Sequence, residues 1–456
     1  MMRLNEAVFA MSAIYNGPDL AVSGISTDSR SVGAGQLFIA LKGERFDGAA
    51  YVGEARSKGA AAAVVEGADF KIGEAGDIPL LLVKNSRRAL ADLAAYWRNR
   101  FDMPIVAVTG SNGKTTVKEM LAGILRETCA AEAQSDAVLA TQGNLNNDIG
   151  VPLTLLNLRA QHRYAVVEIG MNHPGEVRYC TLIVRPDVAL INNAQEAHLE
   201  GLGDIAAVAR AKGELFEGLA ADGIAVINND DPSSILWHAM AQGKRTLTFG
   251  LESKADVSAR FRPEQAGNEM DFDTPQGSAQ TFLPAPGVHN VRNALAATAA
   301  AVALDVPLSA IARGLSRFSG VKGRLARREG ARGATLIDDT YNANPGSVAA
   351  AITVLATASG KKILVLGDMG ELGKDAALLH RRIGVLAREA KIDGLYTLGE
   401  MSRHASEEFG RGRHFDELAP LVAALEEVLD ENVTVLVKGS RFMQMERVVQ
   451  ALAVRE

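Results

Sequence analysis

Short apolar runs rich in β-branched residues alternate with alanine-rich stretches along nearly the whole chain. The runs lie at residues 36–41, 61–66, 80–83, 105–110, 164–170, 188–193, 224–229, 363–368, 394–399 and 434–439. Strands that are apolar at every position are buried on both faces, as happens when helices cover both sides of a parallel sheet. The pattern therefore predicts an α/β fold with parallel sheets.

The length of the chain and two breaks in this pattern indicate three domains. At about 150 residues per domain, 456 residues correspond to three cores. The segment "RNRFDMP" (98–104) ends a predicted helix, and the basic, glycine-rich segment 317–333 lacks apolar periodicity and is interpreted as a hinge. We predict a small N-terminal α/β domain (1–98), a central domain with a mostly parallel sheet (99–325) and a C-terminal Rossmann-like α/β domain (326–456).

The composition argues against several classes of protein. A net charge of −6 and an aromatic content of 5% do not favour nucleic-acid binding. No apolar stretch reaches the about 20 residues needed to span a bilayer, and Asn5 and Glu6 interrupt the N-terminal apolar run, so it does not resemble a signal peptide. Cys129 and Cys180 are far apart, as is typical of free thiols in a reducing compartment. We expect a cytoplasmic monomer that neither binds nucleic acid nor inserts into membranes.

The segment "TGSNGKTT" (109–116) has the features of a phosphate-binding loop. It stands between a predicted strand and a predicted helix, which is the required context. Gly110 and Gly113 would let backbone N–H groups face phosphate oxygens at the start of the helix. Lys114 would reach the β- and γ-phosphates, and the Thr115 hydroxyl would bind Mg²⁺. The motif departs from the strict Walker pattern, because Val108 stands where that pattern has glycine.

Three further residues are candidates whose role the residues alone leave open. Glu168 ends an apolar strand, where it would be either a metal ligand or the cap of the next helix. His198 follows another strand end, and a lone histidine is more often a satisfied surface or core group than a ligand. Lys212 lies on a predicted helix, and its spacing alone favours a solvated lysine.

Seven separated motifs stand in the order found in the Mur ligases, which are ATP-dependent amide-bond synthetases of peptidoglycan precursor assembly. They are "TGSNGKTT", "EIGMN", "AHLEG", "AKGELF", "VHNVRNALAA", "GRL" and "DDTYNANP". Within that family the sequence most resembles the members that add D-alanyl-D-alanine to UDP-N-acetylmuramoyl-tripeptide. That likeness rests on "STDSR…LFIALKGERFDG", "TQGNLNNDIGVPLTLLN", "DDTYNANP" and "VLGDMGELG".

The resemblance implies a site for ATP and two Mg²⁺ ions in the central domain. One ion would be bound through Thr115 and the second by Glu168 and His198. Lys212 would be carbamylated by CO₂, since an ammonium would repel two cations whereas a carbamate supplies a carboxylate-like ligand. The implied catalytic residues are Lys114, Glu168, His198 and Lys212. The implied nucleotide-binding residues are Gly110, Ser111, Asn112, Gly113, Lys114, Thr115, Thr116, Asn290, Asn293, Arg324 and Asp339.

Some of these assignments keep alternatives. Asn290 and Asn293 face one side of the first turns of a helix, where they would contact adenine or serve as capping amides. Arg324 would place its guanidinium on the nucleotide phosphates. Either Asp338 or Asp339 would face the ribose or adenine, and the sequence does not decide which.

The resemblance also distributes the substrates over the domains. The N-terminal domain would bind the UDP end through Ser29 and Arg30, with Lys42 and Asp47 as weaker candidates. The muramoyl-peptide arm would contact Thr141, Asn144 and Asn147 in the central domain. D-alanyl-D-alanine would bind the last domain near Tyr341, Asn342, Asn344 and the segment "GDMGELG" (367–373).

The implied reaction forms an acyl phosphate on the tripeptide carboxylate, which the dipeptide amine then attacks to give UDP-N-acetylmuramoyl-pentapeptide, ADP and phosphate. The sequence does not identify the base that takes the amine proton or the third residue of the tripeptide. A folylpolyglutamate synthase would lack the separate domain 1–98, and a ligase that adds diaminopimelate or lysine would carry a "DNPR"-like motif, which is absent here. A nucleotide-gated switch without turnover would have no use for Glu168, His198 and Lys212 together.

Overall fold

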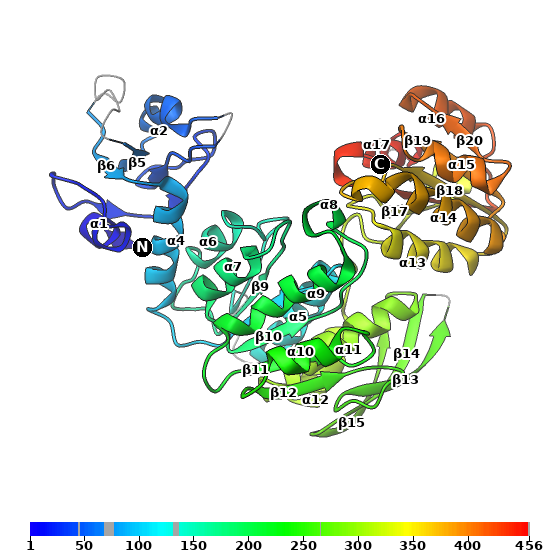
Figure 1. The fold of residues 1–456 in the computed structure, drawn as a ribbon, viewed down its shortest axis with the longest axis horizontal. Coiled ribbons are helices and arrows are strands. Elements are labelled where there is room, and N and C mark those ends of the chain that lie inside the picture. The colour runs from blue at the N-terminus through cyan, green and yellow to red at the C-terminus, as the bar shows by residue number, and fades with distance from the viewer. Residues whose placement is uncertain (44–45, 68–76, 131–135, 265, 455–456) are drawn as a thin grey trace.

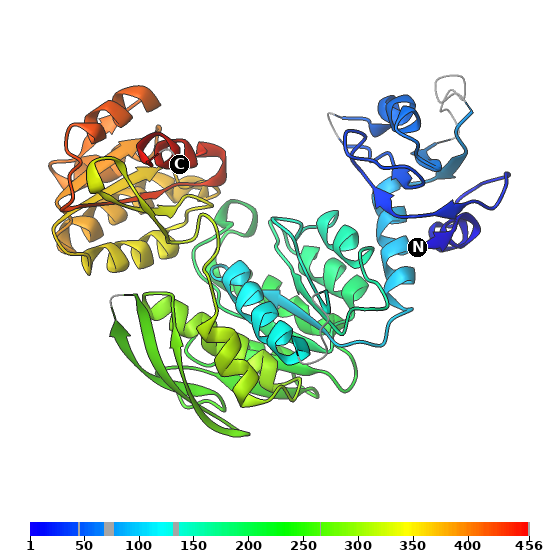
Figure 2. The ribbon, with the colours of Figure 1, turned by 180° about the vertical axis from the view of Figure 1, so that it is seen from behind.

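The computed structural model describes residues 1–456 except 44–45, 68–76, 131–135, 265 and 455–456. The described chain folds into three α/β parts, and the central one lies between the other two (Figures 1 and 2). This confirms the predicted fold class, while the domain limits at residues 98 and 325 stay predictions. Among the described residues, no helix is both long enough and apolar enough to cross a membrane.

The N-terminal domain has a small parallel sheet in the order β3-β4-β5-β6, and β1 and β2 pair antiparallel beside it. Its elements are β1 (Met2–Arg3), α1 (Leu4–Met11), β2 (Ala21–Val22), β3 (Ile25–Ser26), β4 (Leu37–Ile39), α2 (Val52–Ser57), β5 (Ala62–Glu66), β6 (Leu80–Val83) and α4 (Ser86–Arg98). Helix α4 begins where the Asn85 side chain accepts a hydrogen bond from the Arg88 N–H.

Helix α4 joins the first domain to the second through a shared apolar core. Its buried residues Leu90, Leu93 and Trp97 belong to one cluster that also contains Leu4 of the N-terminal domain and Ile105 of the central domain. The Trp97 indole N–H donates to the Leu158 carbonyl, 3.1 Å away. The first two domains are therefore packed together by continuous apolar contact.

The central domain is built on a six-stranded parallel sheet in the order β12-β11-β10-β7-β9-β8. Strand β7 lies inside the sheet, and its residues alternate between two cores, Ile105 and Ala107 on one face and Val106 and Val108 on the other. The elements of the sheet and its helices are β7 (Ile105–Thr109), α5 (Lys114–Cys129), β8 (Val138–Ala140), α6 (Gly150–Leu155), β9 (Tyr164–Glu168), α7 (Glu176–Val184), β10 (Val188–Ile191), α8 (Leu199–Leu202), α9 (Ile205–Gly213), β11 (Ile224–Asn228), α10 (Ser234–Met240) and β12 (Arg245–Phe249).

A three-stranded antiparallel sheet completes the central domain and was not predicted. Its order is β13-β14-β15, and it packs with helices α11 and α12 against the α5 face of the main sheet. These elements are β13 (Ser258–Glu264), β14 (Gly267–Thr274), β15 (Gly277–Leu283), α11 (Val288–Val302) and α12 (Leu308–Ser316). In β14 the buried Met270 and Phe272 alternate with exposed Asp271 and Asp273, so no continuous apolar run marks the strand.

The C-terminal domain has a six-stranded sheet in the order β16-β17-β21-β18-β19-β20, parallel except for β16. Leu364 and Leu366 of β18 enter one core, and Ile363 and Val365 enter the core on the other face. The elements are β16 (Ala326–Glu329), β17 (Thr335–Asp339), α13 (Pro345–Ala356), β18 (Lys361–Gly367), α14 (Ala376–Glu389), β19 (Gly394–Leu398), α15 (Arg403–Phe409), β20 (Arg413–Phe415), α16 (Leu418–Glu426), β21 (Val433–Lys438) and α17 (Glu446–Leu452).

Part of the segment interpreted as a hinge is a strand. Residues 326–329 form β16, which pairs antiparallel with β17 at the edge of the last sheet. The side chains of Arg327, Arg328 and Glu329 are exposed, as is common on an edge strand. The absence of apolar periodicity in this segment therefore reflects an exposed strand edge rather than irregular structure.

Candidate active site

The phosphate loop lies where the central strand β7 ends and α5 begins. Gly113 is the residue before α5 and has φ = +78°, which favours glycine. A Cβ atom there would also clash with the side chains of Asn293 and Asn192. The loop backbone is held by the segment after β10, because the Ser111 N–H donates to the Asn193 carbonyl at 3.0 Å. The loop is thus fixed between a strand, a helix and its neighbouring strand end.

Lys114 lies partly buried at the start of α5. Its ammonium donates to the Gly110 carbonyl at 2.7 Å, so it stays folded over the loop. Burial lowers the pKa of Lys114, and the negative charge of Glu168 opposes that shift while Arg324 adds to it. Lys114, Glu168 and Arg324 are therefore within electrostatic reach of one another. The two cations, Lys114 and Arg324, beside a glycine-bearing loop suit a polyphosphate.

Glu168 is the last residue of β9 and is 2% exposed. One carboxylate oxygen, Oε1, accepts a hydrogen bond from the Asn146 amide at 2.8 Å. The other, Oε2, is buried without a hydrogen-bond partner among the described residues. The Glu168 N–H donates to the Thr141 hydroxyl at 2.9 Å, which fixes the strand end. A buried carboxylate oxygen without a partner is costly, so this atom suits a cation.

His198 lies directly before α8, after the end of β10, with φ = +58°. Its Nδ1 is buried and lies 2.5 Å from Oε2 of Glu371, which belongs to the C-terminal domain. The two groups are at ion-pair distance but are not aligned as a hydrogen bond, as is common in active sites before substrates bind. Contact with His198 is the main reason why the pKa of Glu371 is lowered.

Lys212 lies on α9 and is 1% exposed, so the solvated lysine favoured by its spacing is wrong. It makes no hydrogen bond or ion pair with any described residue. Its pKa is well below the usual lysine value, chiefly because burial removes the ammonium from water and also because Lys114 repels it. Both effects favour the neutral amine, which is the nucleophilic form of a lysine.

The described residues contain no group of three or more His, Cys, Asp or Glu side chains that could hold a metal ion. Glu168 and His198 would thus need further ligands from phosphate oxygens, water, Thr115 or a modified Lys212. Thr115 is buried, and its hydroxyl lies 3.5 Å from the Arg324 guanidinium, whose Nε is buried without a partner in the described structure. Unpaired Glu168 Oε2 and Arg324 Nε are the atoms that a cation and a phosphate would satisfy, so these residues fit a magnesium nucleotide.

Models of three protein domains match this chain in sequence. They are the catalytic domain of the Mur ligase family at residues 21–98, the Mur ligase middle domain at 108–301 and the glutamate ligase domain of Mur ligases at 323–441. The UDP-N-acetylmuramoyl-tripeptide–D-alanyl-D-alanine ligase of Escherichia coli (strain K12) is 41% identical over 453 residues, which cover 98% of each protein. The chain belongs to the Mur ligase family.

Other Mur ligases are similar to this chain over nearly its whole length, in sequence and in structure. The ligase of the same description from Haemophilus influenzae is 43% identical over 462 residues and 99% of each protein. A crystal structure of MurF from Acinetobacter baumannii superimposes with a TM-score of 0.89 at 36% identity, covering 98% of this chain and 97% of that one. MurF from Thermotoga maritima, solved in complex with ADP, has a TM-score of 0.81 at 28% identity, covering 94% and 96%.

In this Mur ligase, the two asparagines predicted to contact adenine lie beside the phosphate loop. Asn290 and Asn293 are both buried on α11. The Asn293 side-chain oxygen accepts from the Asn192 amide at 3.0 Å, and the same amide donates to the Asn112 carbonyl at 2.9 Å. The Asn290 amide donates to the Pro286 carbonyl at 2.9 Å. Asn192 was not predicted, although it follows β10 where ligand-binding residues collect.

Two kinds of contact hold the residues predicted in and next to the C-terminal domain: those of buried carboxylates and one between a guanidinium and an aromatic ring. Asp339 pairs with Lys438 at 2.6 Å, whereas Asp338 accepts from the Thr340 hydroxyl at 2.6 Å, so both carboxylates are already engaged. The Arg324 guanidinium lies over the Tyr341 ring, 4.1 Å from its centroid, and burial raises the pKa of Tyr341.

Asn344 contacts the phosphate loop instead of lying apart from it. Its amide donates to the Asn112 side-chain oxygen at 2.8 Å, while its own oxygen caps α13 by accepting from the Ser347 N–H at 2.8 Å. Asn342 is exposed, and its side-chain oxygen accepts from the Ala343 N–H. The role predicted for Asn342 and Asn344 in dipeptide binding stays a prediction.

The residues predicted for the UDP end lie in the N-terminal domain, away from the phosphate loop. The Ser29 hydroxyl donates to Glu54 at 2.7 Å, and Arg30 is an exposed side chain that pairs with Asp28 at 2.8 Å and lowers the pKa of that carboxyl to about 2. Lys42 and Asp47 form a looser pair at 3.9 Å. Arg30 and Lys42 are thus surface cations, as an anionic ligand would require.

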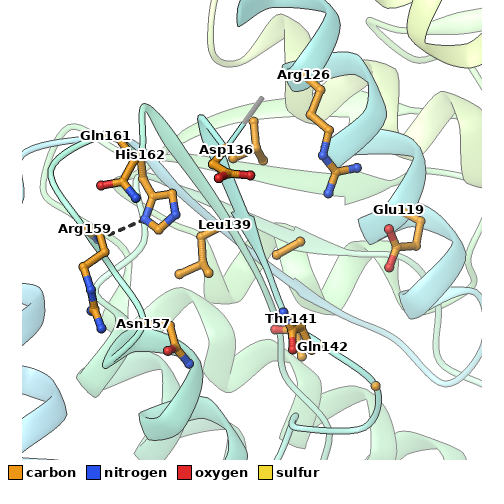
Figure 3. A pocket seen from close by; sticks show the side chains of 13 residues that line it. Glu119, Arg126, Asp136, Leu139, Thr141, Gln142, Asn157, Arg159, Gln161 and His162 are labelled. Atoms are coloured by element: carbon orange, nitrogen blue, oxygen red, sulfur yellow. Dashed lines mark hydrogen bonds between the residues drawn. The ribbon is translucent and has the colours of Figure 1, made fainter. Parts of the chain in front are cut away.

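The segment predicted to bind the muramoyl-peptide arm runs beside β8. Thr141 is buried, Asn144 is exposed, and the Asn147 side-chain oxygen accepts from the Gly150 N–H at the start of α6. The unpredicted Asn146 is the residue that contacts Glu168. A cavity of about 600 Å³ lies along the edge of β8 and includes Thr141 in its lining (Figure 3). Arg126, Arg159 and His162 also line it, so its chemistry is polar.

Proposed function

We propose that this chain is an ATP-dependent ligase that joins D-alanyl-D-alanine to UDP-N-acetylmuramoyl-tripeptide and forms UDP-N-acetylmuramoyl-pentapeptide, ADP and phosphate. Full-length similarity to enzymes of that description supports the reaction. The observation in the structure that supports it best is the pair of unsatisfied atoms, Glu168 Oε2 and Arg324 Nε, beside a glycine-bearing loop with Lys114.

The proposed roles in the chemistry follow from charge. A carboxylate of the tripeptide attacks the γ-phosphorus of ATP, the bond to the bridging oxygen breaks, and ADP leaves. The amine of D-alanyl-D-alanine then attacks the acyl carbon, phosphate leaves, and the amine proton passes to a base. Lys114 and Arg324 offset the negative charge that develops in both steps. Mg²⁺ held through Thr115, Glu168 and His198 would polarise the phosphoryl oxygens.

We further propose that Lys212 becomes a carbamate. Its amine is buried and its pKa is strongly lowered, which favours the neutral form that has a free lone pair. Attack of Nζ on the carbon of CO₂ forms a C–N bond, moves one C=O electron pair onto oxygen and releases a proton. The resulting carboxylate would supply the oxygen ligand that Glu168 and His198 lack.

The other assignments are part of the same proposal. The N-terminal domain would bind the UDP end at Ser29, Arg30, Lys42 and Asp47, and the strand end near Thr141 would face the peptide arm. Two Mg²⁺ ions, a cytoplasmic location, a monomeric state and the lack of nucleic-acid binding stay predictions from the sequence.

Mass spectrometry of the product tests the function directly. The protein is incubated with UDP-N-acetylmuramoyl-tripeptide, ATP and D-alanyl-D-alanine, with D-alanine alone as control. We expect a pentapeptide product and phosphate release that depends on the dipeptide. Lys114→Ala should abolish ligation yet leave binding of the UDP substrate nearly intact. Equal loss of both in Lys114→Ala would contradict the separation of the two sites.

The carbamate has its own test. With ¹³C-bicarbonate, the wild-type protein should show a carbamate carbon signal that Lys212→Met lacks. Lys212→Ala should be inactive, unaffected by bicarbonate and partly restored by a short-chain carboxylic acid. Full activity of Lys212→Ala without any acid would remove Lys212 from the site.

A further inference from the structure

Glu371 and His198 meet across the boundary between the C-terminal and central domains. Glu371 lies in the loop after β18, and His198 lies just before α8, which extends from the central domain toward the C-terminal domain (Figure 1). Besides the 2.5 Å contact between their side chains, the Glu200 N–H donates to the Glu371 carbonyl at 3.2 Å. Leu199 packs against the core of the C-terminal domain. Three consecutive residues of the central domain therefore contact the C-terminal domain here.

Both residues have an unusual backbone conformation. His198 has φ = +58° and Glu371 has φ = +60°, a region that residues other than glycine seldom adopt. Strained conformations persist where the surrounding structure enforces them, and they are common at functional sites. A chance surface ion pair would not require strain in both partners.

The loop that carries Glu371 is anchored on its N-terminal side. The Met369 N–H donates to His380 Nε2 at 3.0 Å, and the Gly370 N–H donates to the Ser440 hydroxyl at 2.8 Å. The next residue, Leu372, is buried at 3% exposure. Glu371 is thus presented to His198 from a fixed position in the C-terminal domain.

We propose that Glu371 is a positioning residue for His198. By binding Nδ1–H, its carboxylate would hold the imidazole in one tautomer and orientation, which leaves Nε2 as the nitrogen for the cation. Histidine ligands commonly donate their second ring N–H to a carboxylate in this way. Because that carboxylate comes from another domain, the metal site is completed only when the C-terminal domain is docked. This inference rests on the proposed function, in which His198 is a magnesium ligand.

The test compares Glu371→Ala and Glu371→Gln with a matched control, Glu196→Gln. Glu196 forms an ion pair with Arg382 across the same domain boundary but does not contact His198. Two quantities are measured in each full-length variant: the dissociation constant of Mn²⁺ from the ADP-loaded protein, by electron paramagnetic resonance, and the Mg²⁺ concentration that half-saturates ligation.

For Glu371→Ala we expect both quantities to rise about 10–100-fold, with kcat at saturating Mg²⁺ less affected. Glu371→Gln should lie between Ala and wild type, because an amide oxygen still accepts from Nδ1–H. Glu196→Gln should stay within about twofold of wild type. Unchanged Mn²⁺ binding in Glu371→Ala, or an equal shift in Glu196→Gln, would overturn the proposal. Absence of ligation by the wild type would instead reject the proposed function, while Mn²⁺ binding would still report on Glu371.

Discussion

Replacing Lys438 with methionine tests how the C-terminal sheet is held at the end nearest the phosphate loop. Lys438 and Asp339 are direct neighbours on the parallel strands β21 and β17. Their side chains are 2% and 9% exposed and lie 2.6 Å apart. Burial lowers the pKa of Lys438, and Asp339 opposes that shift. Without the ammonium, Asp339 would keep only a 3.2 Å hydrogen bond from the Leu325 N–H.

The expected loss follows from leaving one charge buried alone. Removing one partner of a buried ion pair costs about 3–5 kcal/mol, whereas replacing both partners is often nearly neutral. For residues 326–456 unfolding as one unit, that loss corresponds to a fall in Tm of about 10–20 °C. Lys438→Met should show this loss, and Asp339→Asn/Lys438→Met should return to within about 1 kcal/mol of wild type.

The assay must report on the C-terminal domain itself. Both tryptophans, Trp97 and Trp237, lie outside residues 326–456, so their fluorescence would not follow it. Native-state hydrogen exchange of the β21 peptide measures its opening free energy, with the β7 peptide as internal reference. Lys361→Met, an exposed lysine on β18 of the same sheet, is the control and should change little. A double variant as unstable as Lys438→Met would refute the reasoning, since lost packing rather than an unpaired charge would then explain the effect.

Three further predictions concern single side chains. Burial lowers the pKa of His289 to about 4; because the unfolded chain binds this proton near pH 6.5, stability should fall by about 3 kcal/mol between pH 6.5 and pH 4. His289→Gln should flatten that part of a urea-midpoint profile, and identical profiles would contradict it. Burial raises the pKa of Cys180 to about 12, so iodoacetamide at pH 8 should label it only in urea, as checked by mass spectrometry. Labelling of the native protein at the unfolded rate would disprove this. Asn146→Ala removes the amide bound to Glu168 and should raise the half-saturating Mg²⁺ concentration about tenfold. Asn157→Ala, which removes an amide bound only to Leu153, serves as control, and equal Mg²⁺ requirements would count against the role of Asn146.

The strands that could be predicted are those buried on both faces. Runs such as 105–110 and 188–193 became β7 and β10 to within two residues, because a continuous apolar run has few other ways to be buried. Strands β13 to β15 and β16 were missed, since each exposes polar side chains on one or both faces. In β14 the signal is an alternation of apolar and polar residues, and β16 has no apolar signal at all.

Some residues of the candidate site could be predicted from the sequence, and others could not. The phosphate loop and Glu168 could be located because each follows a recognisable strand. The burial of Lys212 could not, because a lysine on a short amphipathic helix normally faces water. Asn146 stands among several asparagines, and only the path of the loop decides which amide reaches Glu168. Glu371 lies 173 positions beyond its partner in another domain, so no local pattern connects it with His198.

The apolar core that runs through α4 has a consequence for substrate selection. The central domain shares a continuous apolar core with the N-terminal domain. Its contacts with the C-terminal domain include polar pairs such as Asn112–Asn344 and Glu196–Arg382. The distance between the first two domains is therefore fixed when the chain folds. Under the proposed function, a sugar nucleotide whose peptide is one residue too short or too long should not bring its carboxylate to the phosphate loop.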